Sequence, residues 1–251
     1  MSEKPQEAGH KLGEGNPEEG KDTSEPVLSV LMPAYNEEAT IEEILERVLA
    51  TPFDKEVVVI DDGSIDRTAE IAEGYSESNV RLVRHDRNRG KGAAVRTGIE
   101  AARGQMVLIQ DADLEYDPEC YGDLLEPLLE GAADVVYGSR FLGGPHRVLY
   151  FWHHMANKLL TFWSDLWSNL DLSDVESGYK AFRKETLEGL DLKENSFGIE
   201  IELTQKLARR RWRIYEVPIS YYGRTYEEGK KIGFTDALRA FWCVMRYRLA
   251  D

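Results

Sequence analysis

The residues of this sequence best suited to chemistry follow an apolar run at 107–109 and form a group of three carboxylates. Asp111, Asp113 and Glu115 occupy alternating positions within five residues. Carboxylates this close repel one another unless a cation lies among them, and Mg²⁺ and Mn²⁺ prefer carboxylate and phosphate oxygens as ligands. The pattern predicts a metal site that binds a diphosphate. The alternative is an acidic turn before a helix that begins near Pro118.

Four short apolar runs in the first 110 residues predict the strands that hold this group. They alternate with amphipathic segments, which is typical of parallel βαβ units. The ends of parallel strands lie on one edge of a sheet, so the polar residues that follow each run should meet in one cleft. The strands are expected at 27–32, 56–60, 80–83 and 106–110, with a fifth at 133–137.

The second half of the chain predicts further helices, one of them unusually aromatic. Residues 148–170 keep apolar side chains at helical spacing but include Lys158 and Asp165. This segment is too polar to span a bilayer. Two interpretations stay open: a helix buried in the core, or one that faces a membrane surface or an acceptor. The other expected elements are helices at 118–129, 199–210 and 235–248 and a strand at 213–221.

Length and charge restrict the class of protein. A chain of 251 residues can form one α/β domain. Its net charge of −15 excludes a nucleic-acid binder, because phosphate backbones require clustered Lys and Arg. Residues 206–248 nevertheless carry eleven basic and four acidic side chains. This segment suits a phosphate-bearing ligand or an anionic membrane surface, or it is a solvated helix face.

Several other kinds of site are excluded by missing patterns. Cys120 and Cys243 show no paired spacing, so neither a disulfide framework nor a zinc site is expected, and a reducing cytosol fits best. No glycine-rich dinucleotide motif or P-loop is present. Residues 1–26 are polar, with seven acidic and three basic side chains and no apolar signal segment, so they predict a disordered acidic tail.

Five short motifs, in this order, resemble those of inverting family 2 glycosyltransferases of the GT-A fold. The resemblance runs from Val27 to Arg248 and implies an α/β fold with a Rossmann-like, mostly parallel sheet, flanking helices and C-terminal acceptor-side helices. It implies a single domain at 27–251, with a nucleotide-sugar-binding half at 27–140 and an acceptor-binding half at 141–251. The motifs are Pro33-Ala34-Tyr35-Asn36-Glu37, Asp61-Asp62-Gly63-Ser64, Asn88-Arg89-Gly90-Lys91-Gly92, Asp111-Ala112-Asp113 and Gly138-Ser139-Arg140.

Within that family the sequence looks most like dolichyl- or polyprenyl-phosphate mannosyl- and glucosyltransferases. Arg224 and Lys230 resemble that subgroup's C-terminal diphosphate-binding loop, although Gly229 replaces the usual Ser. The resemblance implies catalytic roles for Asp111, Asp113, Arg224 and Lys230, and Mg²⁺ or Mn²⁺ held by Asp111, Asp113 and Glu115. The implied nucleotide-sugar-binding residues are Pro33, Tyr35, Glu37, Ile60, Asp62, Lys91, Asp111, Ala112, Asp113, Arg140, Arg224 and Lys230.

The implied reaction moves a hexose from a nucleotide diphosphate sugar to polyprenyl phosphate with inversion. A lipid phosphate is already ionised at neutral pH, so it needs no general base, and Arg140 would then bind it. A soluble or glycan hydroxyl acceptor would instead need a base, for which Asp174, Glu176 and Glu200 are the candidates. A nucleotide-sugar binder without transfer activity is the third hypothesis, and the intact charged residues of the motifs argue against it.

The expected location is cytoplasmic, at the periphery of the membrane. No apolar run is long enough to span a bilayer, so residues 148–167, with Phe234, Phe241 and Trp242, are expected to make weak and reversible contact with the membrane surface. The sequence leaves open UDP or GDP as the donor, glucose or mannose as the sugar, the acceptor's chain length and the oligomeric state.

Overall fold

The computed structural model describes residues 27–143, 150–223 and 234–249, and within the last range it describes side chains from Arg239 onward. The expected tail at 1–26 lies outside these residues, as do Arg224 and Lys230. The described chain forms a seven-stranded sheet in the order β3-β2-β1-β4-β6-β5-β7. The strands are β1 (Leu28–Ala34), β2 (Lys55–Asp61), β3 (Val80–Arg84), β4 (Met106–Ile109), β5 (Val135–Ser139), β6 (Lys180–Arg183) and β7 (Ile214–Pro218).

The sheet is mostly parallel, which confirms the predicted fold class. Only β6 runs antiparallel, and it lies between β4 and β5. All seven residues of β2 are buried, as expected for a central strand covered on both faces. The strands β1, β2 and β4 are neighbours in parallel register, so their carboxyl ends and the loops that follow lie together.

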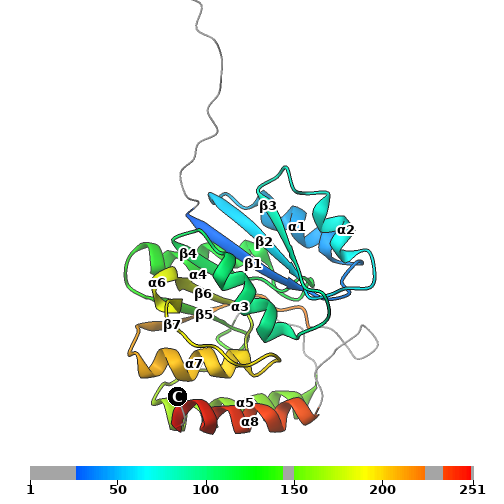
Figure 1. Cartoon of the computed structure of the whole chain (residues 1–251). Coiled ribbons are helices and arrows are strands. Elements are labelled where there is room, and N and C mark those ends of the chain that lie inside the picture. The colour runs from blue at the N-terminus through cyan, green and yellow to red at the C-terminus, as the bar shows by residue number, and fades with distance from the viewer. Residues whose placement is uncertain (1–26, 144–149, 224–233, 250–251) are drawn as a thin grey trace, which may run out of the picture.

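Helices cover both faces of the sheet and add a further layer below it (Figure 1). One core cluster packs α1 and α4 on the sheet, and a second packs α3 and α7 on its other face. The helices α5 and α8 lie against α7 at the bottom of Figure 1. The helices are α1 (Ile41–Ala50), α2 (Thr68–Glu73), α3 (Lys91–Ala101), the 3₁₀ turn η1 (Pro118–Cys120), α4 (Tyr121–Leu129), α5 (Phe151–Ser168), α6 (Lys184–Leu187), α7 (Ile199–Arg209) and α8 (Phe234–Leu249).

The aromatic segment forms one helix, α5, with a buried side and an exposed side. Trp163 and Trp167 pack edge to face, with ring centroids 5.7 Å apart, against the cluster that joins α5, α7 and α8. Large apolar side chains on the other side of α5 are exposed. No helix among the described residues has the length and apolar character needed to cross a bilayer. The exposed large apolar residues of α5 are Phe151, Trp152, Met155, Leu159, Phe162 and Leu166.

Asp165 is an acidic residue of α5 whose environment disfavours its charge. One carboxylate oxygen accepts a hydrogen bond from the Leu172 backbone N–H at 3.2 Å, whereas Oδ1 is buried without a partner. Burial, with smaller contributions from Glu216 and Asp171, raises the pKa of Asp165 to about 7. The folded protein therefore binds a proton here between about pH 4 and pH 7 that the unfolded chain has released, so this site makes stability fall as pH rises through that interval.

We expect Asp165→Asn to stabilise the fold at pH 8 and to have little effect near pH 4. The gain at pH 8 should be on the order of 2 kcal/mol, less than the full pKa shift implies because the carboxyl is only partly buried. Urea unfolding at both pH values measures it. Asp123→Asn, at an exposed position on α4 away from Asp165, is the control. An equal change for Asp165→Asn at pH 4 and pH 8 would contradict the raised pKa.

Candidate active site

The motifs that follow β1 and β2 are held together by backbone and side-chain hydrogen bonds. The Asn36 N–H donates to Ser64 Oγ at 3.0 Å, and Asn36 Oδ1 accepts from the Ile65 N–H at 3.0 Å. The Glu37 N–H donates to Thr68 Oγ1 at 2.8 Å. Asn36 has a φ of 53°, a left-handed conformation that Asn tolerates. The predicted nucleoside residues Pro33, Tyr35 and Glu37 therefore belong to one cross-linked, partly buried wall.

Asp62, the predicted ribose ligand, is 3% exposed and holds the loop that leads to α3. Its carboxylate accepts from the backbone N–H groups of Arg89 at 2.9 Å and Gly90 at 2.7 Å. His85 Nδ1 lies 2.6 Å from the same carboxylate, and its Nε2 lies 2.9 Å from Thr97 Oγ1. Asp62 thus supports the site by placing residues 89–91, and its contact with a ribose stays a prediction.

The residues just before Asp62 differ from what sequence reasoning assigned to them. The Ile60 side chain is fully buried in the core beside Gly98, so only its backbone could reach a nucleoside. Asp61, which sequence reasoning left out, is fully buried, and its Oδ1 accepts from the Ser64 N–H at 3.1 Å. Its Oδ2 lies 3.1 Å from Arg84 Nε but has no partner of hydrogen-bond geometry. The adjacent pair of aspartates was the available signal, because consecutive strand residues point to opposite faces.

The loop after β4 is shaped by a buried amide. Gln110 Nε2 donates to the carbonyl oxygens of Asp111 at 3.2 Å and Tyr116 at 3.3 Å. Its Oε1 accepts from the Tyr121 hydroxyl at 3.1 Å. Because a buried amide with all these bonds is costly to move, the loop from Asp111 to Tyr116 is held in a defined turn.

The three carboxylates of this loop have different surroundings. Asp111 is paired with Lys91, and Asp113 Oδ1 accepts from the Glu115 N–H at 3.1 Å. Glu115 Oε2 accepts from the Tyr221 hydroxyl at 3.0 Å. Within residues 27–143, 150–223 and 234–249, no three His, Cys, Asp or Glu side chains form a group able to hold a metal. The predicted trio is therefore not assembled there, although Asp111 and Asp113 both follow β4.

Two carboxylates still suit a divalent cation that arrives with a nucleotide. Mg²⁺ is usually held in proteins by one or two carboxylates together with substrate phosphates and water, rather than by a full cage of side chains. The side chains of Asp111 and Lys91 retain 20% and 16% of their exposure, so phosphate oxygens can reach them. The donor set therefore fits a metal–diphosphate ligand, with Asp111 and Asp113 as the protein's oxygens.

Lys91, at the first position of α3, joins the loop after β4 to α7. Its Nζ lies 2.8 Å from Asp111 Oδ1 and 3.1 Å from Glu200 Oε1. Burial opposes its charge, but Asp111 and Glu200 together raise the pKa of Lys91 well above its usual value. Glu200 Oε2 is buried without a hydrogen-bond partner. Lys91 is thus a fixed positive charge beside the expected diphosphate, and Glu200, predicted on the acceptor side, is its partner.

Arg140 and Asp174, both predicted to meet the acceptor, are paired with each other. Arg140 Nε and Nη2 lie 2.6 and 2.7 Å from the two oxygens of Asp174. Burial alone would raise the pKa of Asp174, yet the charge and hydrogen bonds of Arg140 hold it below its usual value. Asp174 is therefore a weak base. The Arg140 guanidinium also lies over the Tyr221 ring, 5.2 Å from the ring centroid, and this contact helps to fix its orientation.

Glu176 is the acceptor-side carboxylate best suited to take up a proton. It has no hydrogen bond or ion pair with the described part of the chain. Burial raises the pKa of Glu176 above its usual value despite the opposing charge of Arg140. The Lys180 ammonium donates to the carbonyls of Val175 and Ser177 and lies 4.3 Å from the Tyr137 ring centroid. Lys180, which sequence reasoning did not select, thereby holds the loop that carries Glu176.

Gly178 lies against the Lys91–Asp111 pair. A Cβ at this position would lie 2.9 Å from Lys91 Nζ and 3.0 Å from Asp111 Oδ2. The contacting atoms are the ends of side chains, so Gly178→Ala should displace the ion pair without unfolding the chain. We expect kcat/KM for the reaction that the sequence motifs imply to fall by about ten- to a hundredfold, as small misplacements of reacting groups do, with a nearly unchanged melting temperature.

The control for this prediction is Gly122→Ala on α4. A Cβ there meets nothing within 4 Å, so activity should be retained. Full activity of Gly178→Ala would show that the position of the Lys91–Asp111 pair is unimportant for turnover, and a large drop in melting temperature would show that the displaced atoms cannot move.

The chain resembles several proteins of known activity. A profile of glycosyl transferase family 2 matches residues 29–190. Over 228 residues the chain is 32% identical to a dolichol-phosphate mannosyltransferase of Pyrococcus furiosus, a match that covers 88% of this chain and 64% of the relative. Over 221 residues it is 32% identical to an undecaprenyl-phosphate mannosyltransferase of Micrococcus luteus, covering 82% and 88%.

Two further similar proteins limit which properties can be inferred for this chain from its relatives. A low-salt glycan biosynthesis hexosyltransferase of Haloferax volcanii is 33% identical and is covered over 54% of its length, so the chain spans about half to two thirds of this relative and the Pyrococcus one. Glucosyl-3-phosphoglycerate synthase of Mycobacterium tuberculosis, solved with Mn²⁺, UDP and glucosyl-3-phosphoglycerate, superposes with a TM-score of 0.66. At 24% identity, with 89% of this chain and 80% of that one covered, this likeness concerns the fold.

Proposed function

The chain belongs to glycosyl transferase family 2, and we propose that it transfers glucose or mannose from a UDP- or GDP-sugar to polyprenyl or dolichyl phosphate with inversion. In this reaction a bond forms between a phosphate oxygen of the acceptor and C1 of the sugar, and the bond from C1 to the nucleoside diphosphate breaks. The named activities of the Pyrococcus and Micrococcus relatives support the acceptor class. We further propose that residues 27–251 act as one domain, with the donor bound by 27–140 and the acceptor by 141–251.

The donor side of the proposal rests on Asp111, Asp113 and Lys91. Asp111 and Asp113 would hold Mg²⁺ or Mn²⁺, which would neutralise charge on the departing diphosphate. Lys91 lies 3.0 Å or less from both oxygens of Asp111, so it is placed to stabilise the same charge as it develops. Arg224 and Lys230 would add two more positive charges. They lie outside the described residues, so their roles rest on the sequence alone.

The observation that carries the lipid acceptor is the exposed apolar side of α5. Trp152 is 79% exposed and Phe162 is 64% exposed, which is a large apolar area for the surface of a polar protein. The same helix reaches the acceptor side of the site, because Asn157 Nδ2 donates to Asp174 Oδ1 at 3.2 Å. A membrane surface bound by α5 would therefore present its lipid phosphates close to Arg140. This arrangement supports a peripheral location at a membrane, and the cytoplasmic face is proposed from the sequence alone.

A soluble or glycan hydroxyl acceptor is the second candidate, and Glu176 favours it. A hydroxyl nucleophile needs a base, and a half-buried carboxylate with a raised pKa and no described partner suits that role. A phosphate acceptor needs no such group. Under the proposed lipid reaction, Glu176→Gln should therefore leave turnover nearly unchanged, whereas a hydroxyl acceptor predicts a loss of about 10²-fold or more.

The test supplies the purified protein with vesicles that contain polyprenyl phosphate and with UDP-glucose, GDP-mannose or GDP-glucose carrying a labelled hexose. Each donor is tried with Mg²⁺, with Mn²⁺ and with EDTA. Label that extracts into organic solvent and is released by mild acid supports the lipid phosphate acceptor. With a soluble glycan added to the same mixture, label that stays in water in a product distinct from both the donor and the free sugar would support the hydroxyl acceptor instead. Donor binding without transfer to any acceptor would contradict both.

A further inference from the structure

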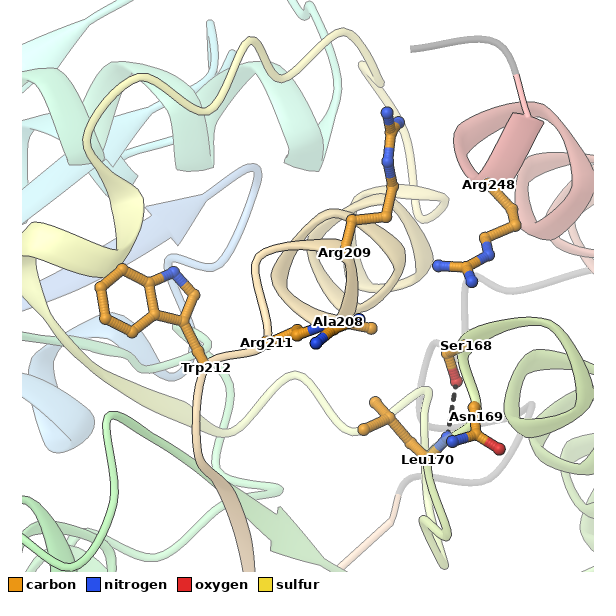
Figure 2. A pocket seen from close by; sticks show the side chains of 8 residues that line it. All are labelled: Ser168, Asn169, Leu170, Ala208, Arg209, Arg211, Trp212 and Arg248. Atoms are coloured by element: carbon orange, nitrogen blue, oxygen red, sulfur yellow. Dashed lines mark hydrogen bonds between the residues drawn. The ribbon is translucent and has the colours of Figure 1, made fainter.

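A second concave site lies at the opposite end of α5 from the acceptor side. The C-terminal ends of α5 and α7 and the last turn of α8 surround a cavity of about 510 Å³ (Figure 2). Asn157, which contacts Asp174, is eleven residues before Ser168 at the cavity, which is roughly 16 Å along the helix axis. The cavity is lined by Ser168, Asn169, Leu170, Ala208, Arg209, Arg211, Trp212 and Arg248.

The charges that line this cavity are all positive. Arg209 and Arg211 come from the end of α7, and Arg248 extends from α8 across the gap toward α7 (Figure 2). No Asp or Glu is among the lining residues. None of the three guanidinium groups has a hydrogen bond or an ion pair with residues 27–143, 150–223 or 239–249. In a chain with a net charge of −15, three arginines gathered around one cavity without an acidic residue are attractive to an anion.

Other arginines of the chain do form such pairs. Arg213, two residues after Arg211, donates to both oxygens of Asp134 at 3.0 and 2.6 Å. Arg239, on α8 with Arg248, lies 2.8 Å from Glu194. The three cavity arginines lack such a carboxylate partner in the described part of the chain, as Arg210 and Arg246 also do, but only these three line the cavity.

The three side chains do not cap the helix ends by hydrogen bonds, although Arg209 and Arg248 lie in last turns, where their charge favours the helix. Basic residues often satisfy the free carbonyls of a last helical turn, but backbone groups already do so here. The Asn169 N–H donates to Asp165 O at 2.8 Å at the end of α5. The N–H groups of Arg210 and Arg211 donate to Leu207 O and Ala208 O, both at 3.1 Å, at the end of α7.

The backbone at Arg211 is a second indication of function. Its φ is 59°, in the left-handed region where glycine is favoured after a helix. A bulky residue in that conformation is strained, and such strain is concentrated at binding and catalytic positions. A glycine would fit this backbone conformation better, but only an arginine places a positive charge at the cavity.

We propose that this cavity binds a phosphate-bearing anion, drawn in by the positive charge of the three arginines and held by charge-assisted hydrogen bonds from those that reach it. The ligand could be the headgroup of an anionic phospholipid or a free phosphate compound. The exposed side chains of Leu166 and Leu249 flank the cavity residues Ser168 and Arg248 in the sequence. Exposed apolar side chains within two residues of a basic cavity suit a lipid, whose chains and headgroup require both.

The test compares the wild-type chain with Arg209→Gln/Arg211→Gln/Arg248→Gln. Binding is measured by flotation with vesicles of phosphatidylcholine alone, or with about a third of phosphatidylglycerol, and by calorimetric titration with inorganic phosphate. A lipid site predicts that the triple variant loses on the order of a hundredfold in affinity for the anionic vesicles, from about one factor of five per arginine. A free-phosphate site predicts saturable phosphate binding that only the triple variant loses.

The controls separate this site from general charge and from folding. Arg47→Gln/Arg67→Gln/Arg246→Gln removes the same number of charges at exposed positions away from the cavity and should bind like the wild type. Arg211→Gly removes one cavity charge and relieves the left-handed strain, so it should weaken binding while keeping or raising the melting temperature. If the cavity variants bind anionic vesicles and phosphate as well as the wild type does, the proposal is overturned. These readouts do not involve sugar transfer, so that outcome would leave the proposed reaction untouched.

Discussion

Asp113→Asn is expected to reduce glycosyl transfer by about 10²–10³-fold while leaving the fold intact. The substitution removes one ionic oxygen from the proposed metal–diphosphate site, and deletion of a single electrostatic contact to a transition state has this order of effect. The amide keeps an oxygen that can still accept from the Glu115 N–H, now 3.1 Å from Asp113 Oδ1. The loop should therefore keep its turn, and the melting temperature should change little.

The measurement is turnover as a function of Mg²⁺ or Mn²⁺ concentration. The variant should need more metal for half-maximal rate, because one of its two proposed protein ligands is neutral. Asp117→Asn is the matched control, since Asp117 caps η1 four residues later by accepting from the Glu119 N–H, and it should retain full activity. Wild-type turnover that persists in EDTA would show that the carboxylates act without a metal.

Asp111→Asn is a less informative substitution, for a reason that only the structure reveals. Asp111 is one of two carboxylates that neutralise Lys91, and removal of one partner leaves a buried charge uncompensated. A loss of activity in that variant would combine a missing metal ligand with a displaced lysine and a weaker fold. Asp113 does not neutralise Lys91, so the loss of activity in Asp113→Asn measures the loss of the proposed metal ligand.

Much of the fold could be predicted from the sequence because it depends on local patterns. The apolar runs at β1, β2 and β4 and the helical spacing of α1 and α7 are all seen in the structure. Element ends were predicted less well. The apolar spacing of α1 is visible in the sequence, but the helix begins only at Ile41, because residues 36 and 37 bond to the motif after β2. That interaction spans about thirty residues of sequence, and no local signal encodes it.

In the candidate site, too, the sequence predicts which kinds of residue gather but not which of them pair with one another. Residue types and strand ends predict which side chains gather at the edge of the sheet, and Lys91, Asp111 and Glu200 do so. They do not predict which charges neutralise one another. Arg140 and Asp174 were assigned separate roles toward the acceptor, yet they form a bidentate pair across 34 residues. This pair depends on how close the end of β5 lies to the segment before β6, which only the folded chain determines.

Helical spacing alone does not show which side of α5 is exposed, as Trp163 and Trp167 illustrate. Trp163 and Trp167 were grouped with all the aromatic residues at 148–167 as contacts for a membrane. In the structure they are partly buried against α7 and α8, because their side of the helix faces the cluster that includes Leu160 and Val244. The membrane-facing proposal therefore belongs to the other side of the helix.

The Trp152→Ser/Phe162→Ser double variant is expected to lose transfer to polyprenyl phosphate in vesicles by at least about 10²-fold. Each of these exposed side chains would contribute about 2 kcal/mol if it entered the membrane, and together they would account for that factor. Neither lies in a core cluster of the described chain, so the melting temperature and donor binding should stay close to those of the wild type. Flotation with neutral vesicles measures the attachment directly.

Trp163→Ser/Trp167→Ser provides the opposite case and completes the test. These rings pack on each other and on the cluster beneath them, so their loss should lower the stability by about 3 kcal/mol or more. The exposed pair should thus affect membrane attachment without affecting stability, and the inner pair should affect stability first. If the Trp152→Ser/Phe162→Ser protein still floats with vesicles and transfers at the wild-type rate, the exposed side of α5 does not bind the membrane, and the acceptor must reach Arg140 by another surface.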